Sequence, residues 1–182
     1  MKRTSLTFLS LVVLLIGAAT LPAVARSAEG GSTDANKALA RRVPNEVFNQ
    51  GNTAAIDELF TATYLSHGRT AAEDTHGTDG FKQFVAGLRT AFPDFHQTVE
   101  DQIAEGDKVV TRLTMHGTQK GELKMGPGPA IPPTGKEFTT TGVVIDRIEN
   151  GKIAETWANI DLLAVLQQLG LLPPPPAPPT AP

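Results

Sequence analysis

The stretch WANID, residues 157–161, combines residue types suited to acid–base chemistry on a small molecule. Trp157, Asn159 and Asp161 occupy alternate positions, so in a strand their side chains share one face. An indole, an amide and a carboxylate suit the wall of a cavity that holds a mostly apolar ligand through a few polar contacts. In such a cavity Asp161 is a candidate general acid and base, because desolvation raises the pKa of a carboxyl group toward neutrality.

The same alternation assigns the residues that precede Trp157 to two faces. Ile153 and Glu155 fall on the face of Trp157, which adds a second carboxylate to it. The opposite face is small and mostly apolar, as expected for a surface packed under a helix or another protomer; it comprises Ala154, Thr156, Ala158 and Ile160.

Asp161 and Trp157 each have a structural interpretation as well. Asp161 directly precedes the helical pattern LLAVLQQLG, so its carboxylate could cap the free backbone N–H groups of that helix. A capping role lowers the pKa of a carboxyl group, whereas a catalytic role in an apolar cavity raises it. Trp157 could equally be a core residue, because large aromatic side chains are mostly buried.

Three further residues are candidates for contact with a ligand. His67 and Tyr64 follow the second predicted helix, where the chain would enter a cavity. There His67 could donate a hydrogen bond to a developing enolate or act as a second acid–base group; the alternative is a loop histidine in water. Tyr64 has the same two interpretations. His116 lies on one face of a predicted strand, and the alternation leaves open whether that face points inward.

Other chemistries lack the residues they need. The sequence contains no cysteine, so it offers neither a thiol nucleophile nor a thiolate metal site. His67 and His76 flank two acids but lack a recurring metal-ligand spacing. No Gly-x-Ser-x-Gly motif follows a strand, and no glycine-rich phosphate loop is present. We therefore expect no metal site.

The hydrophobic periodicity changes once along the chain, from helical spacing to alternation. It predicts helices at 36–48, 53–60 and 78–91, two strand pairs at 96–119 and 135–161, and a last helix after Asp161. Pro44 either kinks the first helix or separates two turns. The strand pairs turn at residues 105–107 and at Asn150-Gly151, a strong hairpin signal. This order predicts an α+β fold in which a curved antiparallel sheet wraps around the N-terminal helices and encloses a pocket.

Both ends of the chain differ in composition from the middle. Residues 1–25 have a basic start, an apolar run and an Ala-x-Ala ending, the pattern of a cleaved signal peptide, although an uncleaved anchor is the alternative. Residues 26–35 are expected to be a flexible leader, 36–172 the domain, and 173–182 a proline-rich tail. The chain is therefore expected to be exported to the periplasm or the extracellular space.

The charge excludes two classes of partner. The formal net charge of the 182 residues is −3, and removing Lys2 and Arg3 with the signal takes it to −5. A mildly acidic domain without a basic cluster argues against nucleic acid and, after signal cleavage, against a membrane partner. A small hydrophobic molecule is the expected ligand, and a homodimer is the expected assembly.

Residues 36–170 resemble the SnoaL-like polyketide cyclase, or ester cyclase, family of the nuclear transport factor 2-like superfamily. The resemblance rests on GTDGFKQFVAGLRTAFPDF, EGDKVVTRLTMHGTQKGEL, PPTGKEFTTTGVVIDRIENGKIAETWANID and VLQQLG. It implies a cone-shaped barrel with an apolar internal pocket. It also implies an intramolecular aldol closure in which an aspartate acts as acid and base without metal or organic cofactor. Asp161 matches that aspartate by context.

Two positions depart from the pattern of this family. Gln119 stands where relatives often have histidine, and Ala158 stands where an acid often follows the tryptophan. Two functions therefore stay open. The first is a cofactor-independent enzyme in which Asp161 moves a proton while His67, with Asn159 or Tyr64, stabilises an oxyanion. The second is a pocket protein that binds a hydrophobic molecule without turnover.

Overall fold

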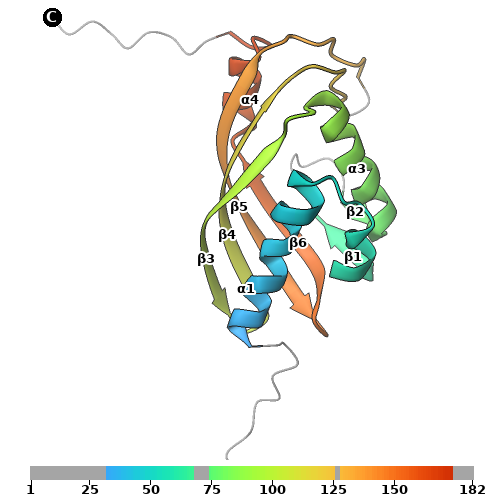
Figure 1. Cartoon of the computed structure of the whole chain (residues 1–182), viewed down its shortest axis with the longest axis vertical. Coiled ribbons are helices and arrows are strands. Elements are labelled where there is room, and N and C mark those ends of the chain that lie inside the picture. The colour runs from blue at the N-terminus through green and yellow to red at the C-terminus, as the bar shows by residue number, and fades with distance from the viewer. Residues whose placement is uncertain (1–31, 68–73, 126–127, 174–182) are drawn as a thin grey trace, which may run out of the picture.

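The computed structural model describes residues 32–67, 74–125 and 128–173 (Figure 1). The predicted signal segment 1–25 lies outside these residues, as does nearly all of the predicted proline-rich tail. No helix within the described ranges is long and apolar enough to cross a membrane.

A curved six-stranded sheet forms the scaffold of the molecule, with the strand order β2-β1-β6-β5-β4-β3. Its strands are β1 (Phe60–Ser66), β2 (Thr75–His76), β3 (His96–Glu105), β4 (Lys108–Thr118), β5 (Glu137–Glu149) and β6 (Lys152–Ile160). The α+β class and the curved sheet are confirmed. The sheet does not close into a barrel, because β2 and β3 form its two edges and do not pair with each other.

The two predicted hairpins are present with the predicted turns. Strands β3 and β4 pair antiparallel around Gly106, and β5 and β6 pair around Asn150 and Gly151. Asn150 and Gly151 both have positive φ, 51° and 75°, as a two-residue turn between right-twisted strands requires.

Helices cover one side of the sheet, which we call the inner face; the other side is the outer face. They are α1 (Thr33–Arg42), the π-helix η1 (Val43–Asn49), α2 (Ala55–Leu59) and α3 (Gly77–Ala91), followed after β6 by α4 (Leu162–Gln168). The first helix begins at Thr33 rather than residue 36, because the Ser32 side chain caps it. Pro44 lies in the first turn of η1, so it separates two helical segments.

Strand β1 is an element that the periodicity did not predict. Its buried residues Phe60 and Tyr64 share one face, but Ala62 between them on that face is exposed, so alternation is weak within the strand. It pairs in parallel with β6 and places the backbone N–H of His67 on the carbonyl oxygen of Thr156, at 2.9 Å. Residues far apart in the sequence thereby become neighbours.

Aromatic side chains fill the core between the helices and the inner face. Phe48, Phe60, Tyr64, Phe81 and Phe95 are buried and contact one another edge-on or tilted. The inner face contributes buried aliphatic and aromatic residues from its central strands, including Val109, Leu113, Met115, Phe138 and Ile148. This packing fixes which face of β5 and β6 points inward.

Candidate functional site

The inner face of β5 and β6 becomes more open toward the carboxyl end of β6. Next to the β5–β6 turn, the paired residues Ile148 and Ile153 are sealed, with 2% and 0% of their surface exposed. The next inward residues, Asp146 and Thr156, are also paired and buried. Beyond them the surface is apolar and only half-buried, formed by Val144, Ala158 and Ile160, which we call the inner apolar patch.

Asp146 is a buried carboxyl group at the sealed edge of this patch. The hydroxyl of Thr156 donates a hydrogen bond of 2.7 Å to its Oδ1 atom. Burial raises the pKa of Asp146 to about 7, and the hydrogen bond from Thr156 opposes the rise. Among the described residues, no lysine, arginine or histidine pairs with this carboxylate. The group is therefore suited to gain or lose a proton near neutral pH.

A β-bulge in β6 alters the predicted assignment of faces. Ile153 pairs with Ile148 while Glu155 pairs with Arg147, so Ala154 is an extra residue in β6. Ile153 consequently points into the core, and its predicted place on the face of Trp157 is wrong. Ala154 and Thr156, which the alternation assigned to a packed face, are both buried.

Trp157 and His67 lie together on the outer side of β6. Their rings stack with centroids 4.9 Å apart and planes 10° apart. Nε2 of His67 lies 2.8 Å from Oε1 of Glu155, and Nε of Arg147 donates to the other oxygen at 2.9 Å. The bond with Glu155 is the main cause that raises the pKa of His67, with Asp74 adding to it. The structure thus stacks Trp157 on His67, which itself belongs to an ion-pair cluster with Glu155 and Arg147.

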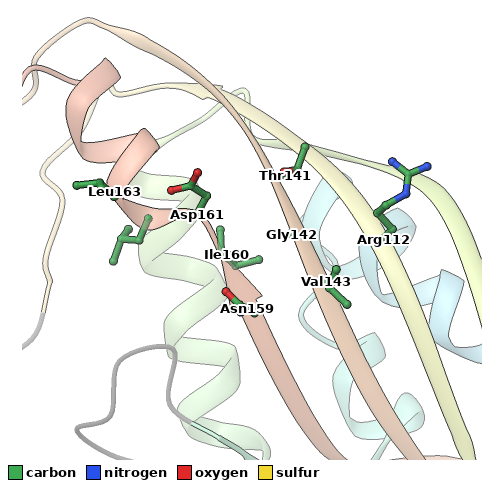
Figure 2. Close-up of a pocket in the computed structure, with 9 residues that line it drawn as sticks. Arg112, Thr141, Gly142, Val143, Asn159, Ile160, Asp161 and Leu163 are labelled. Carbon is green, nitrogen blue, oxygen red and sulfur yellow. The ribbon is translucent and has the colours of Figure 1, made fainter. Parts of the chain in front are cut away.

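Asp161 is the N-cap of α4. Its carboxylate accepts a hydrogen bond of 3.0 Å from the backbone N–H of Ala164, so the capping interpretation describes the observed geometry. The residue is exposed at the rim of an open concavity of about 700 Å³ (Figure 2). That concavity is lined by Arg112, Thr141, Gly142, Val143, Asn159, Ile160, Asp161, Leu162 and Leu163. A role of Asp161 in proton transfer stays a prediction.

The other two predicted residues lie elsewhere. Tyr64 is buried in the core, 4.6 Å from Phe60 and 5.6 Å from Phe81 between ring centroids. His116 is exposed on β4, and its ring lies 5.3 Å from that of His96 on β3. The structure therefore brings together His67 with Trp157, and Asn159 with Asp161, but it does not gather all six residues in one site.

Comparison with known proteins identifies the family of this chain. Residues 38–169 match the family model described as SnoaL-like polyketide cyclase. The chain belongs to this family. It is 31% identical over 124 residues to nogalonic acid methyl ester cyclase of Streptomyces nogalater, and this alignment covers 68% of this chain and 89% of the relative. It is 30% identical over 134 residues to aklanonic acid methyl ester cyclase of Streptomyces peucetius, which covers 72% and 88%.

Solved structures of similar proteins have the same fold. TsrD of Streptomyces laurentii is 29% identical, has a TM-score of 0.64, and covers 76% of this chain and 97% of its own. AclR of Streptomyces galilaeus, a candidate hydroxylase, is 28% identical with a TM-score of 0.67 and covers 80% and 87%.

In this SnoaL-like chain, Gln119 has a structural role. It is fully buried, its amide nitrogen donates to the carbonyl oxygens of Gly121 and Pro132, and its amide oxygen accepts from the Thr134 hydroxyl. These three bonds connect the end of β4 to the proline-rich loop before β5. Gln119 therefore holds the loop in place.

The sequence analysis missed Asp146 and Thr156. Alternation along GVVIDRI places Asp146 on the same face of the strand as Val144 and Ile148. A lone acid between two aliphatic residues on one face was the available signal.

Proposed function

We propose that this SnoaL-like protein closes a ring in a small hydrophobic carbonyl compound by acid–base chemistry, without a metal or an organic cofactor. Membership in a family of polyketide cyclases supports the reaction class. Its similarity to two methyl ester cyclases supports a methyl ester as the substrate class.

The observation that carries the proposal is the inner apolar patch beside the buried carboxyl group of Asp146. An apolar surface favours a hydrophobic substrate, and the exclusion of water strengthens each polar contact made there. A carboxyl group whose pKa lies near neutrality is available for proton transfer at that surface.

The reaction balances without a co-reactant. A base takes the proton from a carbon next to one carbonyl group, and the electron pair of that C–H bond forms a new C–C bond to a second carbonyl carbon of the same molecule. The second carbonyl oxygen, now an alkoxide, takes the proton back. The product is an isomer of the substrate, so no oxidant, reductant or leaving group is needed.

The test is incubation of the purified chain with nogalonic acid methyl ester and with aklanonic acid methyl ester, before and after treatment with a metal chelator. We expect a product of unchanged mass and new chromatographic retention, formed at the same rate after chelation. Tight binding without an isomeric product would instead support the non-catalytic pocket protein. Loss of activity on chelation would contradict the metal-free chemistry.

The proposal retains two expectations from the sequence. The protein is exported by way of residues 1–25, and it pairs with a second copy of itself. Exposed apolar residues on the sheet, Ile103 at 65% and Val143 at 39%, support pairing, because a partner protomer would bury them. Sedimentation velocity of the purified chain measures the assembly, and a purely monomeric species would contradict it.

A further inference from the structure

Asp146 is a buried acid that the fold does not need for packing. It occupies an inner-face position between Val144 and Ile148, which are both aliphatic. Across the sheet its neighbours are Val109 on β4 and Thr156 on β6, and neither of them titrates. A carboxylate in such surroundings weakens the folded state, and a neutral residue of similar shape would avoid that cost.

The position of Asp146 places its carboxyl group next to a surface that could bind a ligand. Asp146 and Thr156 lie between the sealed pair Ile148 and Ile153 and the inner apolar patch. A hydrophobic molecule bound on that patch would therefore have this carboxyl group at one end. No described donor bonds to Oδ2, whereas Thr156 occupies Oδ1.

The other two candidate acid–base residues, His67 and Asp161, are held by other interactions. His67 is engaged by Glu155 beside Trp157, on the outer side of β6. Asp161 is exposed, and its carboxylate caps α4. Neither group lies on the inner face, where the helices and the sheet exclude water.

We propose that Asp146 is the catalytic residue that removes and returns the proton in this site, and that Thr156 is the residue that positions it. This inference rests on the proposed function. Asp146, as the carboxylate, takes the proton from the carbon next to a substrate carbonyl; the C–H electron pair forms the new C–C bond. Asp146, now the carboxylic acid, returns the proton to the alkoxide oxygen.

Thr156 has two effects on this proton transfer. Its hydroxyl fixes the carboxyl group through Oδ1, which leaves Oδ2 for the substrate. Its hydrogen bond also lowers the pKa of Asp146 against the effect of burial, and no charged side chain within the described part of the chain contributes to that pKa. The pH at which the base becomes active is therefore set by burial and by Thr156.

The test compares the parent with Asp146→Asn, Thr156→Val and the control Asp101→Asn, which removes an exposed carboxylate from β3. With aklanonic acid methyl ester, we expect Asp146→Asn to bind the ester and to lose turnover by about a hundred-fold or more. We expect the turnover of the parent to rise with pH through about 7, as the Asp146 carboxyl group loses its proton. Thr156→Val shifts this rise to higher pH, and Asp101→Asn leaves it in place.

A second measurement separates this inference from the ring-closure proposal. The ester is incubated with the protein in D₂O, and mass spectrometry follows the replacement of the hydrogen next to the ester carbonyl by deuterium. This exchange requires only that a base removes the proton and that a deuteron returns. Exchange by the parent that is lost in Asp146→Asn supports the inference even where no ring closes. Exchange that persists in Asp146→Asn, or that the parent lacks, overturns it, as does a Thr156→Val profile identical to that of the parent.

Discussion

Replacing Asp146 with asparagine should make the stability of the protein less dependent on pH. In the parent, burial raises the pKa of Asp146 from 3.8 to about 7. The folded state therefore holds this proton more tightly than the unfolded state. Below about pH 4 both states carry the proton, so the group costs nothing. Between about pH 4 and 7 the unfolded state has lost the proton and the folded state keeps it, so stability falls as pH rises.

The size of the effect follows from the two pKa values. A tenfold change in an equilibrium constant corresponds to about 1.4 kcal/mol, so the rise from 3.8 to about 7 weakens the folded state by about 4 kcal/mol above pH 8. This is a large part of the roughly 5–15 kcal/mol that stabilises an ordinary domain. Asparagine has a similar shape, accepts the Thr156 hydrogen bond and does not ionise, so it escapes this penalty.

The assay is urea unfolding of the parent and of Asp146→Asn at pH 4 and at pH 9. The free energy of unfolding of the variant minus that of the parent should be about 4 kcal/mol larger at pH 9 than at pH 4, so the variant gains stability relative to the parent as pH rises. Any fixed cost of the amide, such as an unpaired N–H, cancels in this comparison. A relative stability that is the same at both pH values would refute the argument, because it would mean that Asp146 titrates alike in both states.

Four further outcomes are expected. Asp161→Asn should keep the cap of α4 and stay within about 1 kcal/mol of the parent in urea unfolding, since asparagine and aspartate cap about equally well; parental turnover in this variant would show that Asp161 is only a cap. His67→Gln should destabilise the chain more at pH 5 than at pH 8, because Glu155 raises the pKa of His67. The stabilisation by their ion pair is lost as pH rises through that pKa. Equal effects at both pH values in denaturant titrations would contradict the pairing. Gln119→Ala should lower the free energy of unfolding by about 2 kcal/mol, because it removes the hydrogen bonds that the Gln119 amide makes with the half-buried Thr134 hydroxyl and the Pro132 carbonyl. An unchanged urea midpoint would argue against that role. Intact-mass measurement of the exported protein should find a chain that begins near Arg26, and a product that keeps residues 1–25 would contradict the signal.

Local sequence determined the elements that depend on near neighbours. The helical spacing of Phe81, Val85 and Leu88 was sufficient for α3, and the Asn150-Gly151 turn was sufficient for the β5–β6 hairpin. Such features form from contacts within a few residues, so their signals survive in a single sequence. Asp161 belongs to this group, since its capping bond to Ala164 spans one helical turn.

Only the tertiary structure decided which side of the sheet points inward. Alternation divides β6 into two faces, but the helices that cover one of them come from residues far earlier in the chain. The bulge at Ala154 then moves Ile153 to the opposite face, and the parallel pairing of β1 with β6 brings His67 to Trp157. The pKa of Asp146 depends on the removal of water by the whole packed core, a quantity that no local pattern of residues contains.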